Sequence, residues 1–225
     1  MSTKSVCDMS CGSMHEFALV LDKAGFDADL VQKIVNSKGN KHAKMMYATL
    51  IEGENTVEQC LKCISDGTNL VIPACDGSET LADASDVFKS GIDPDFKNWG
   101  LSKPSKPTGI TPVNVHEMAK DADFKTMFTH LEANLEKLCF TEHQIKVFCK
   151  ELPDWLRADG YGTFFLTKKD WKKPATIGNL FVACVDVYPD GLLVYATRFE
   201  GDYMWGADFR HRLVVPQLEP QSFKN

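Results

Sequence analysis

The chain has 225 residues, of which 44% are hydrophobic and 25% are charged, and its formal net charge is −6 at pH 7. This composition is typical of a folded globular protein and excludes a largely disordered chain, which would contain fewer apolar residues. The acidic balance argues against unspecific binding to nucleic acid or anionic lipid, because such binding depends on clustered Lys and Arg.

No window reaches the roughly 18 uninterrupted apolar residues of a membrane-spanning helix. Residues 1–17 lack the apolar core of a secretory signal. We therefore expect a soluble cytoplasmic protein with no membrane partner. In that compartment the eight cysteines are expected to be reduced thiols.

Residues 1–65 are predicted to form a helical bundle. Apolar side chains recur at helical spacing from Met14 to Ser65, which favours four short helices. Gly25 is suited to end the first of these helices, and Asp27 and Asn40 are suited to begin the second and third.

Two segments of this bundle, residues 21–35 and 50–64, resemble the helix-turn-helix of Cro/repressor-type DNA-binding proteins. In that family a Glu-Gly turn precedes a helix that packs on the bundle, and Glu52 and Gly53 occupy that place. The resemblance implies that the helix carrying Lys41, His42 and Lys44 enters the major groove. The alternative is a helical bundle with a solvated lysine face.

The chain has one CxxC pair, Cys60 and Cys63, which could in principle join other Cys or His residues in a zinc site. Val57, Cys60, Leu61 and Ile64 follow the spacing of one helix face, so we interpret Cys60 as a core residue of a fourth helix. We expect no metal and no cofactor. The usual nucleotide-binding, metalloprotease and hydrolase motifs are absent.

Residues 66–113 have no clear periodicity and are rich in proline after Asp93, so we predict an irregular linker.

Residues 114–225 are predicted to form an α+β domain. Asn114 with Glu117, and Thr141 with Gln144, suit capping boxes of helices, and Pro153 is expected to end or bend the second helix. Four segments after residue 160 read as strands, which favours helices packed on a four- or five-stranded antiparallel sheet.

The segment from Tyr188 to Leu192 predicts a β-hairpin, with Pro189, Asp190 and Gly191 in a three-residue loop. This register pairs Val185 with Tyr195. It also puts Asp186 and Arg198 on one face of the sheet.

The last predicted strand contains Arg210, His211 and Arg212. Alternation places His211 on the apolar side, where we expect a buried imidazole holding a hydrogen bond, and the two arginines on the other face. If Arg198 shares that face, the sheet carries an arginine patch beside Trp205 that suits phosphate, RNA or an acidic protein. The alternative is an exterior face with salt bridges.

The helices, the antiparallel sheet and its Arg, His and Tyr residues also resemble the layout of small bacterial ribonuclease toxins, which implies an RNA-directed enzyme. Residues 24–31, 141–166 and 190–218 resemble a set of uncharacterised bacterial proteins; that resemblance implies no activity and no site residues. Our main hypothesis is a non-enzymatic interaction protein with a protein partner. The alternatives are a DNA-binding regulator that uses Lys41, His42 and Lys44, and an RNA-directed enzyme that uses Arg198, Trp205, Arg210 and Arg212.

Overall fold

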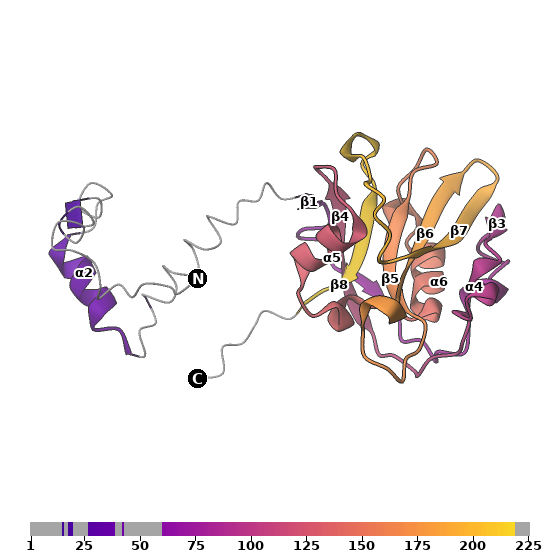
Figure 1. The fold of residues 1–225 in the computed structure, drawn as a ribbon, viewed down its shortest axis with the longest axis horizontal. Helices are drawn as coiled ribbons and strands as arrows, with labels where there is room; N and C mark the ends of the chain where they lie inside the picture. The colour runs from indigo at the N-terminus through magenta and orange to yellow at the C-terminus, as the bar shows by residue number, and fades with distance from the viewer. Residues whose placement is uncertain (1–14, 16–17, 20–26, 39–41, 43–59, 219–225) are drawn as a thin grey trace. The chain divides into compact units, whose positions relative to one another are not determined.

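The structure, a computed structural model, describes residues 15, 18–19, 27–38, 42 and 60–218. The chain divides into two compact units, Met1–Val57 and Glu58–Asn225 (Figure 1). Unit 1 contains helix α2, Ala28–Val35. Asp29 lies in its first turn and Lys33 in its last, where each charge is favourable to the helix dipole.

The predicted helical bundle over residues 1–65 is wrong. In the described part of this region α2 is the one helix with defined bounds, and the predicted helix residues 43–59 lie outside the described residues. Residues predicted to continue the fourth helix form strand β1 instead, Leu61–Cys63. This strand pairs with β4, Thr111–Met118, in antiparallel register.

Unit 2 is built on one mixed sheet of eight strands, in the order β1-β4-β8-β5-β6-β7-β3, with β2 also paired to β4 (Figure 1). Besides β1 and β4, the strands are β2 (Leu70–Ile72), β3 (Gly91–Ile92), β5 (Thr163–Lys168), β6 (Leu180–Tyr188), β7 (Gly191–Arg198) and β8 (Arg212–Pro216). The pairs β5 with β8 and β3 with β7 are parallel, and the others are antiparallel. The prediction of a four- or five-stranded antiparallel sheet is therefore wrong in both size and type.

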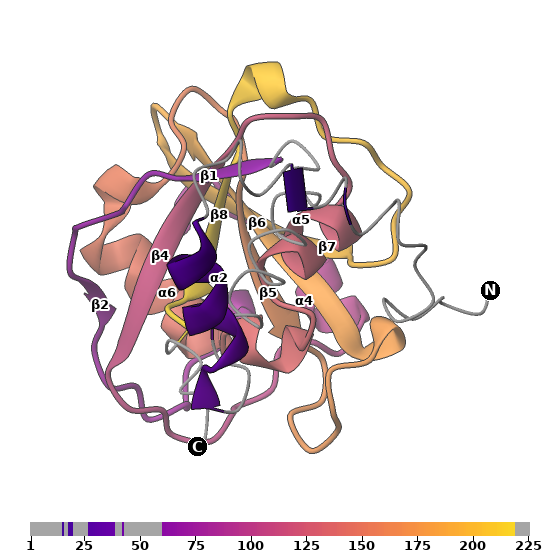
Figure 2. The same cartoon turned by 90° about the vertical axis from the view of Figure 1, so that its left-hand side faces the viewer.

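Two helices cover opposite faces of the sheet, as Figure 2 shows. Helix α5, Phe124–Leu131, packs with Phe164 of β5 and Leu213 of β8 in one apolar core. Helix α6, Glu142–Glu151, packs with Phe165 in the other core. The alternation of side chains along β5 explains how adjacent phenylalanines enter different cores.

The local signals of α6 are confirmed. Thr141 Oγ1 accepts a hydrogen bond from the Gln144 backbone N–H at 3.2 Å, and Gln144 Oε1 accepts one from the Thr141 N–H at 3.0 Å. This capping box begins the helix as predicted, and the helix ends at Glu151, two residues before Pro153. The second predicted box is wrong, because Asn114 and Glu117 lie inside strand β4.

The segment predicted as an irregular linker is part of the fold of unit 2. It contributes β2, β3 and the short helix α4, Asp95–Asn98, and its 3₁₀ turn at Leu81–Asp83 faces α6. The side chains of Leu81, Phe88 and Phe96 are almost fully buried in the core beneath α6. In the described part of the chain no helix is both long and apolar enough to cross a membrane.

Candidate functional site

The residues predicted to contact DNA are only partly described. Lys41 and Lys44 lie outside the described residues. His42 is exposed, its backbone N–H donates to Ser37 Oγ at 3.3 Å, and it borders a shallow depression beside α2. The depression is also bordered by Asp29, Gln32, Lys33 and Asn36.

The three arginines of the predicted patch are not brought together. Arg198 ends β7, and its guanidinium lies 4.9 Å from the ring centroid of Trp99. Arg212 begins β8 and is half-buried, donating from Nη1 to the carbonyl oxygen of Leu156 at 3.0 Å. Two strands, β5 and β6, separate β8 from β7, so the strands that carry these two arginines lie about 14 Å apart across the sheet.

Arg210 lies outside the strand that was predicted to contain it. It is exposed, and its backbone adopts the left-handed conformation with φ 51°, ending the 3₁₀ turn Ala207–Phe209. The strand begins only at Arg212. The alternation that put Arg210 and Arg212 on one face therefore does not apply.

The hairpin between β6 and β7 has a register one residue away from the prediction. Tyr188 pairs with Gly191, so the loop contains two residues, and Val185 pairs with Val194. The one-residue change moves Arg198 to the face of Phe181 and leaves Asp186 on the opposite face. Asp186 is buried, its Oδ1 has no hydrogen-bond partner among the described residues, and desolvation raises its pKa to about 6.

His211 has the role expected for it. It is 5% exposed, and its Nδ1 accepts a hydrogen bond from the Gly162 N–H at 3.0 Å. Its ring stacks on Phe164 with 5.1 Å between centroids, and Trp205 lies edge-on at 5.0 Å. Desolvation lowers the pKa of this imidazole, so the neutral form is favoured. A buried ring held in this way acts as a structural residue.

Trp205 links this buried aromatic cluster to the surface. Its ring contacts Phe164 in the core at 4.6 Å and Tyr203 on the surface at 4.8 Å, between ring centroids. Phe209 lies 5.8 Å from His211 and stacks on Tyr161 at 5.0 Å. A continuous series of rings therefore runs from the core to the exposed segment between β7 and β8.

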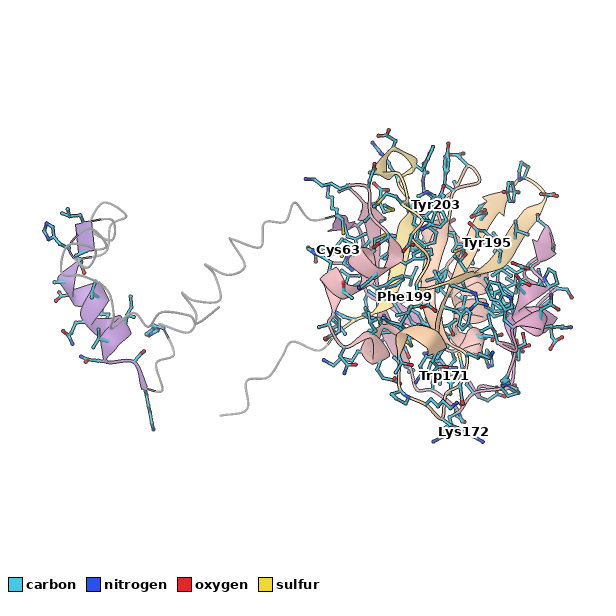
Figure 3. The ribbon with its side chains drawn as sticks, viewed as in Figure 1. Cys63, Trp171, Lys172, Tyr195, Phe199 and Tyr203 are labelled. Carbon is cyan, nitrogen blue, oxygen red and sulfur yellow. The ribbon has the colours of Figure 1, made fainter. Side chains whose placement is uncertain are left out.

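Three large apolar side chains in the segment between β7 and β8 are unusually exposed for their type. Tyr203, Met204 and Phe209 are 65%, 58% and 46% exposed, and we call these three residues the Tyr203 patch. Figure 3 shows Tyr203 near one end of unit 2. Exposed carboxylates lie near the patch residues in the sequence, at Glu200, Asp202 and Asp208.

The backbone that carries the Tyr203 patch is fixed by hydrogen bonds to distant segments. Trp205 and Ala122 exchange two backbone hydrogen bonds, at 3.0 and 3.2 Å. Asp121 accepts from the Ala207 N–H at 2.8 Å, and Arg157 Nε donates to the Phe209 carbonyl at 3.0 Å. The patch is thus presented in a defined geometry on a segment without regular strand structure.

The sequence placed Trp205 beside the predicted arginine patch, but it gave no reason to select Met204 and Phe209. Exposed apolar residues in a connecting segment have no periodicity that would distinguish them from buried ones. The signal that could have found them is the density of large apolar side chains between Gly201 and Phe209, among glycines and carboxylates.

In the part of the chain that the structure describes, no three His, Cys, Asp or Glu side chains are grouped so that they could hold a metal ion. Cys60 is buried, and desolvation raises the pKa of its thiol, which disfavours the thiolate.

Comparisons with known proteins add no relative to this picture, since no family model, curated protein or solved structure matches the chain. Functional inference therefore depends on the chemistry of the surface itself.

Proposed function

We propose that the chain is an interaction protein that binds a protein partner through the Tyr203 patch. The observation that carries this proposal is the exposure of three large apolar side chains on a segment whose backbone is fixed. Tyr, Met and Phe are enriched in protein interfaces relative to the rest of the surface. Because the segment is already ordered, binding would not require its backbone to be immobilised, which favours affinity.

The charges around the patch indicate the kind of partner. Glu200, Asp202 and Asp208 are exposed, and Arg210 is the exposed cation of the same segment. A partner with an apolar centre and a basic rim would be complementary to this arrangement. Tyr203 and Met204 would enter the apolar centre, where anchors of this kind contribute most of the binding energy.

The geometry offers less support to the two alternative functions. DNA binding was attributed to Lys41, His42 and Lys44, and of these the structure describes only His42. An RNA-directed enzyme would need arginines gathered on the sheet, whereas Arg198 lies over Trp99 and Arg212 donates to the Leu156 carbonyl.

The test is site-specific photo-crosslinking in the cells that naturally produce the protein, with a benzophenone amino acid at position 203. We expect one discrete adduct with a second protein, and its loss when Met204→Ser and Phe209→Ser are added. The control places the same crosslinker at Ile110, which is 70% exposed in another part of unit 2. The same adducts at both positions, or none at position 203, would contradict the proposal.

A further inference from the structure

A second surface lies on the loop between β5 and β6, which we call the lysine loop, residues 169–179. Its conformation is fixed by Asn179, a buried residue. Asn179 Nδ2 donates to the carbonyl oxygens of Asp170 and Pro174 at 3.1 and 3.2 Å, and its Oδ1 accepts from the Asp170 N–H at 2.9 Å. Glu136 holds the far side of the loop by accepting from the Ala175 N–H at 2.7 Å.

Positive charge is concentrated on this loop. Lys169, Lys172 and Lys173 surround a single carboxylate, Asp170. The Lys172 N–H donates to Asp170 Oδ1 at 3.0 Å, and Lys173 Nζ lies 3.7 Å from Asp170 Oδ2 with its side chain 72% exposed. The charge of Lys103, which comes from a separate segment near the loop, helps to lower the pKa of Asp170. This cluster is locally cationic in a chain whose net charge is −6.

An aromatic ring stands among these lysines. Trp171 is half-buried, and the ammonium group of Lys168 lies 4.7 Å from its ring centroid. Lys168 is only 3% exposed and donates to the carboxylate of Glu136 and to the carbonyl oxygen of Lys173. Because Lys168 is buried, it occupies the inner side of the indole. Trp171 itself is partly exposed, and the two residues that follow it in the sequence, Lys172 and Lys173, are exposed.

We propose that the lysine loop, with Lys103, is a binding site for single-stranded nucleic acid, whose phosphates contact the lysines and one of whose bases stacks on Trp171. A basic surface combined with an aromatic platform is the arrangement by which proteins bind single strands without sequence preference. An acidic protein segment would use the lysines but would gain little from the indole. Trp171 therefore decides between these two classes of ligand.

This site is separate from the Tyr203 patch and does not depend on the function proposed for it. Figure 3 shows Trp171 and Lys172 toward one end of unit 2, and Tyr203 toward the other. Each surface can therefore be changed without altering the other.

The experiment measures fluorescence anisotropy of a labelled oligothymidylate of about 12 nucleotides with the full chain, at salt concentrations from about 50 to 200 mM. We expect Lys172→Glu with Lys173→Glu to weaken binding at least about tenfold at the lower salt concentration. The slope of log affinity against log salt should become shallower by about 1.4, since each phosphate contact on a single strand contributes about 0.7.

Trp171→Ala should weaken binding about tenfold, and Trp171→Phe should restore most of the loss, because a phenyl ring still stacks. The control is Lys89→Glu with Lys125→Glu, which makes the same change in net charge at exposed positions elsewhere in unit 2. Thermal unfolding of each variant shows that it is folded. If Trp171→Ala does not fold, Trp171→Phe and the lysine pair still test the site.

Three results would overturn the proposal. The first is no binding by the unmodified protein at about 50 mM salt. The second is an equal loss of affinity in both pairs of lysine variants, which would indicate attraction by net charge alone. The third is competition by polyglutamate as strong as that of the oligonucleotide, together with full affinity in Trp171→Ala, which would assign the loop to an acidic protein segment.

Discussion

Gly162 and His211 lie side by side at the starts of β5 and β8, where the Gly162 N–H donates to His211 Nδ1 at 3.0 Å. Any residue except proline could donate this backbone hydrogen bond, but packing requires a glycine here. A Cβ atom at position 162 would lie 2.5 Å from Cε1 of Phe164 and 3.4 Å from His211 Nδ1. The ring series that supports the Tyr203 patch therefore begins at a position with no room for a side chain.

Gly162→Ala should destabilise unit 2 by about 1–3 kcal/mol, the typical cost of overpacking a closed core. The measurement is the free energy of urea-induced unfolding, followed by circular dichroism. Gly178→Ala is the matched control, because a Cβ at position 178 meets no atom within 4 Å. A cost below about 0.5 kcal/mol at Gly162, as expected for an ordinary surface substitution, would show that Phe164 can move aside.

Burial of His211 should make unit 2 less stable as the pH becomes more acidic. Burial lowers the pKa of this imidazole in the folded protein, whereas the unfolded chain binds a proton at the ordinary value near 6.5. Its contribution to stability is therefore complete above the unfolded value and is lost as pH falls below it, by at most about 1.4 kcal/mol per pH unit.

The variant that isolates this effect is His211→Asn, since an amide oxygen can replace Nδ1 as the acceptor and does not titrate. Between pH 7 and pH 5 the unmodified protein should lose more unfolding free energy than this variant. His42→Asn, at an exposed position in unit 1, is the control. Parallel pH profiles for the unmodified protein and His211→Asn would contradict the assignment.

Local hydrogen bonding explains which elements the sequence could predict. Helix α6 was predicted correctly because Thr141 and Gln144 cap it within four residues, and Pro153 ends it. The turn at Pro189 and Asp190 was also recognisable, but the loop length was not. Gly191 belongs to the strand and pairs with Tyr188, and this one-residue difference reversed the faces assigned to β7.

Pairing between distant segments explains what the sequence could not predict. Leu61–Cys63 is too short to show a period of two, and its helical apolar spacing is overridden by pairing with His116 to Met118. Asn114 resembles a helix cap in sequence, but it lies opposite Val215 in the sheet. The same limit applies to the sites, because the anchoring of the Tyr203 patch comes from Ala122 and Arg157, which are remote in sequence.

A buried carboxyl group predicts a second pH dependence, with the opposite sign. Glu142 is 5% exposed at the start of α6, and its Oε2 accepts from the Leu81 N–H at 2.6 Å. Desolvation raises its pKa from 4.5 to about 7, although the hydrogen bond from Leu81 opposes this shift. The folded state therefore holds this proton more tightly than the unfolded state does, and stability falls as pH rises from about 4.5 to 7.

Glu142→Gln removes the charge and retains an oxygen that can accept from Leu81. The free energy of unfolding of this variant, relative to that of the unmodified protein, should increase by on the order of 2 kcal/mol as the pH rises from 5 to 8. Taking the difference between the two pH values cancels any constant cost of the amide group, and Asp186 contributes equally to both proteins. The measurement is urea unfolding at each pH, with Glu151→Gln, an exposed position on the same helix, as the control. If the difference in unfolding free energy between Glu142→Gln and the unmodified protein is the same at pH 5 and pH 8, Glu142 is already ionised at pH 5. Its hydrogen bond from Leu81 would then hold it in that form.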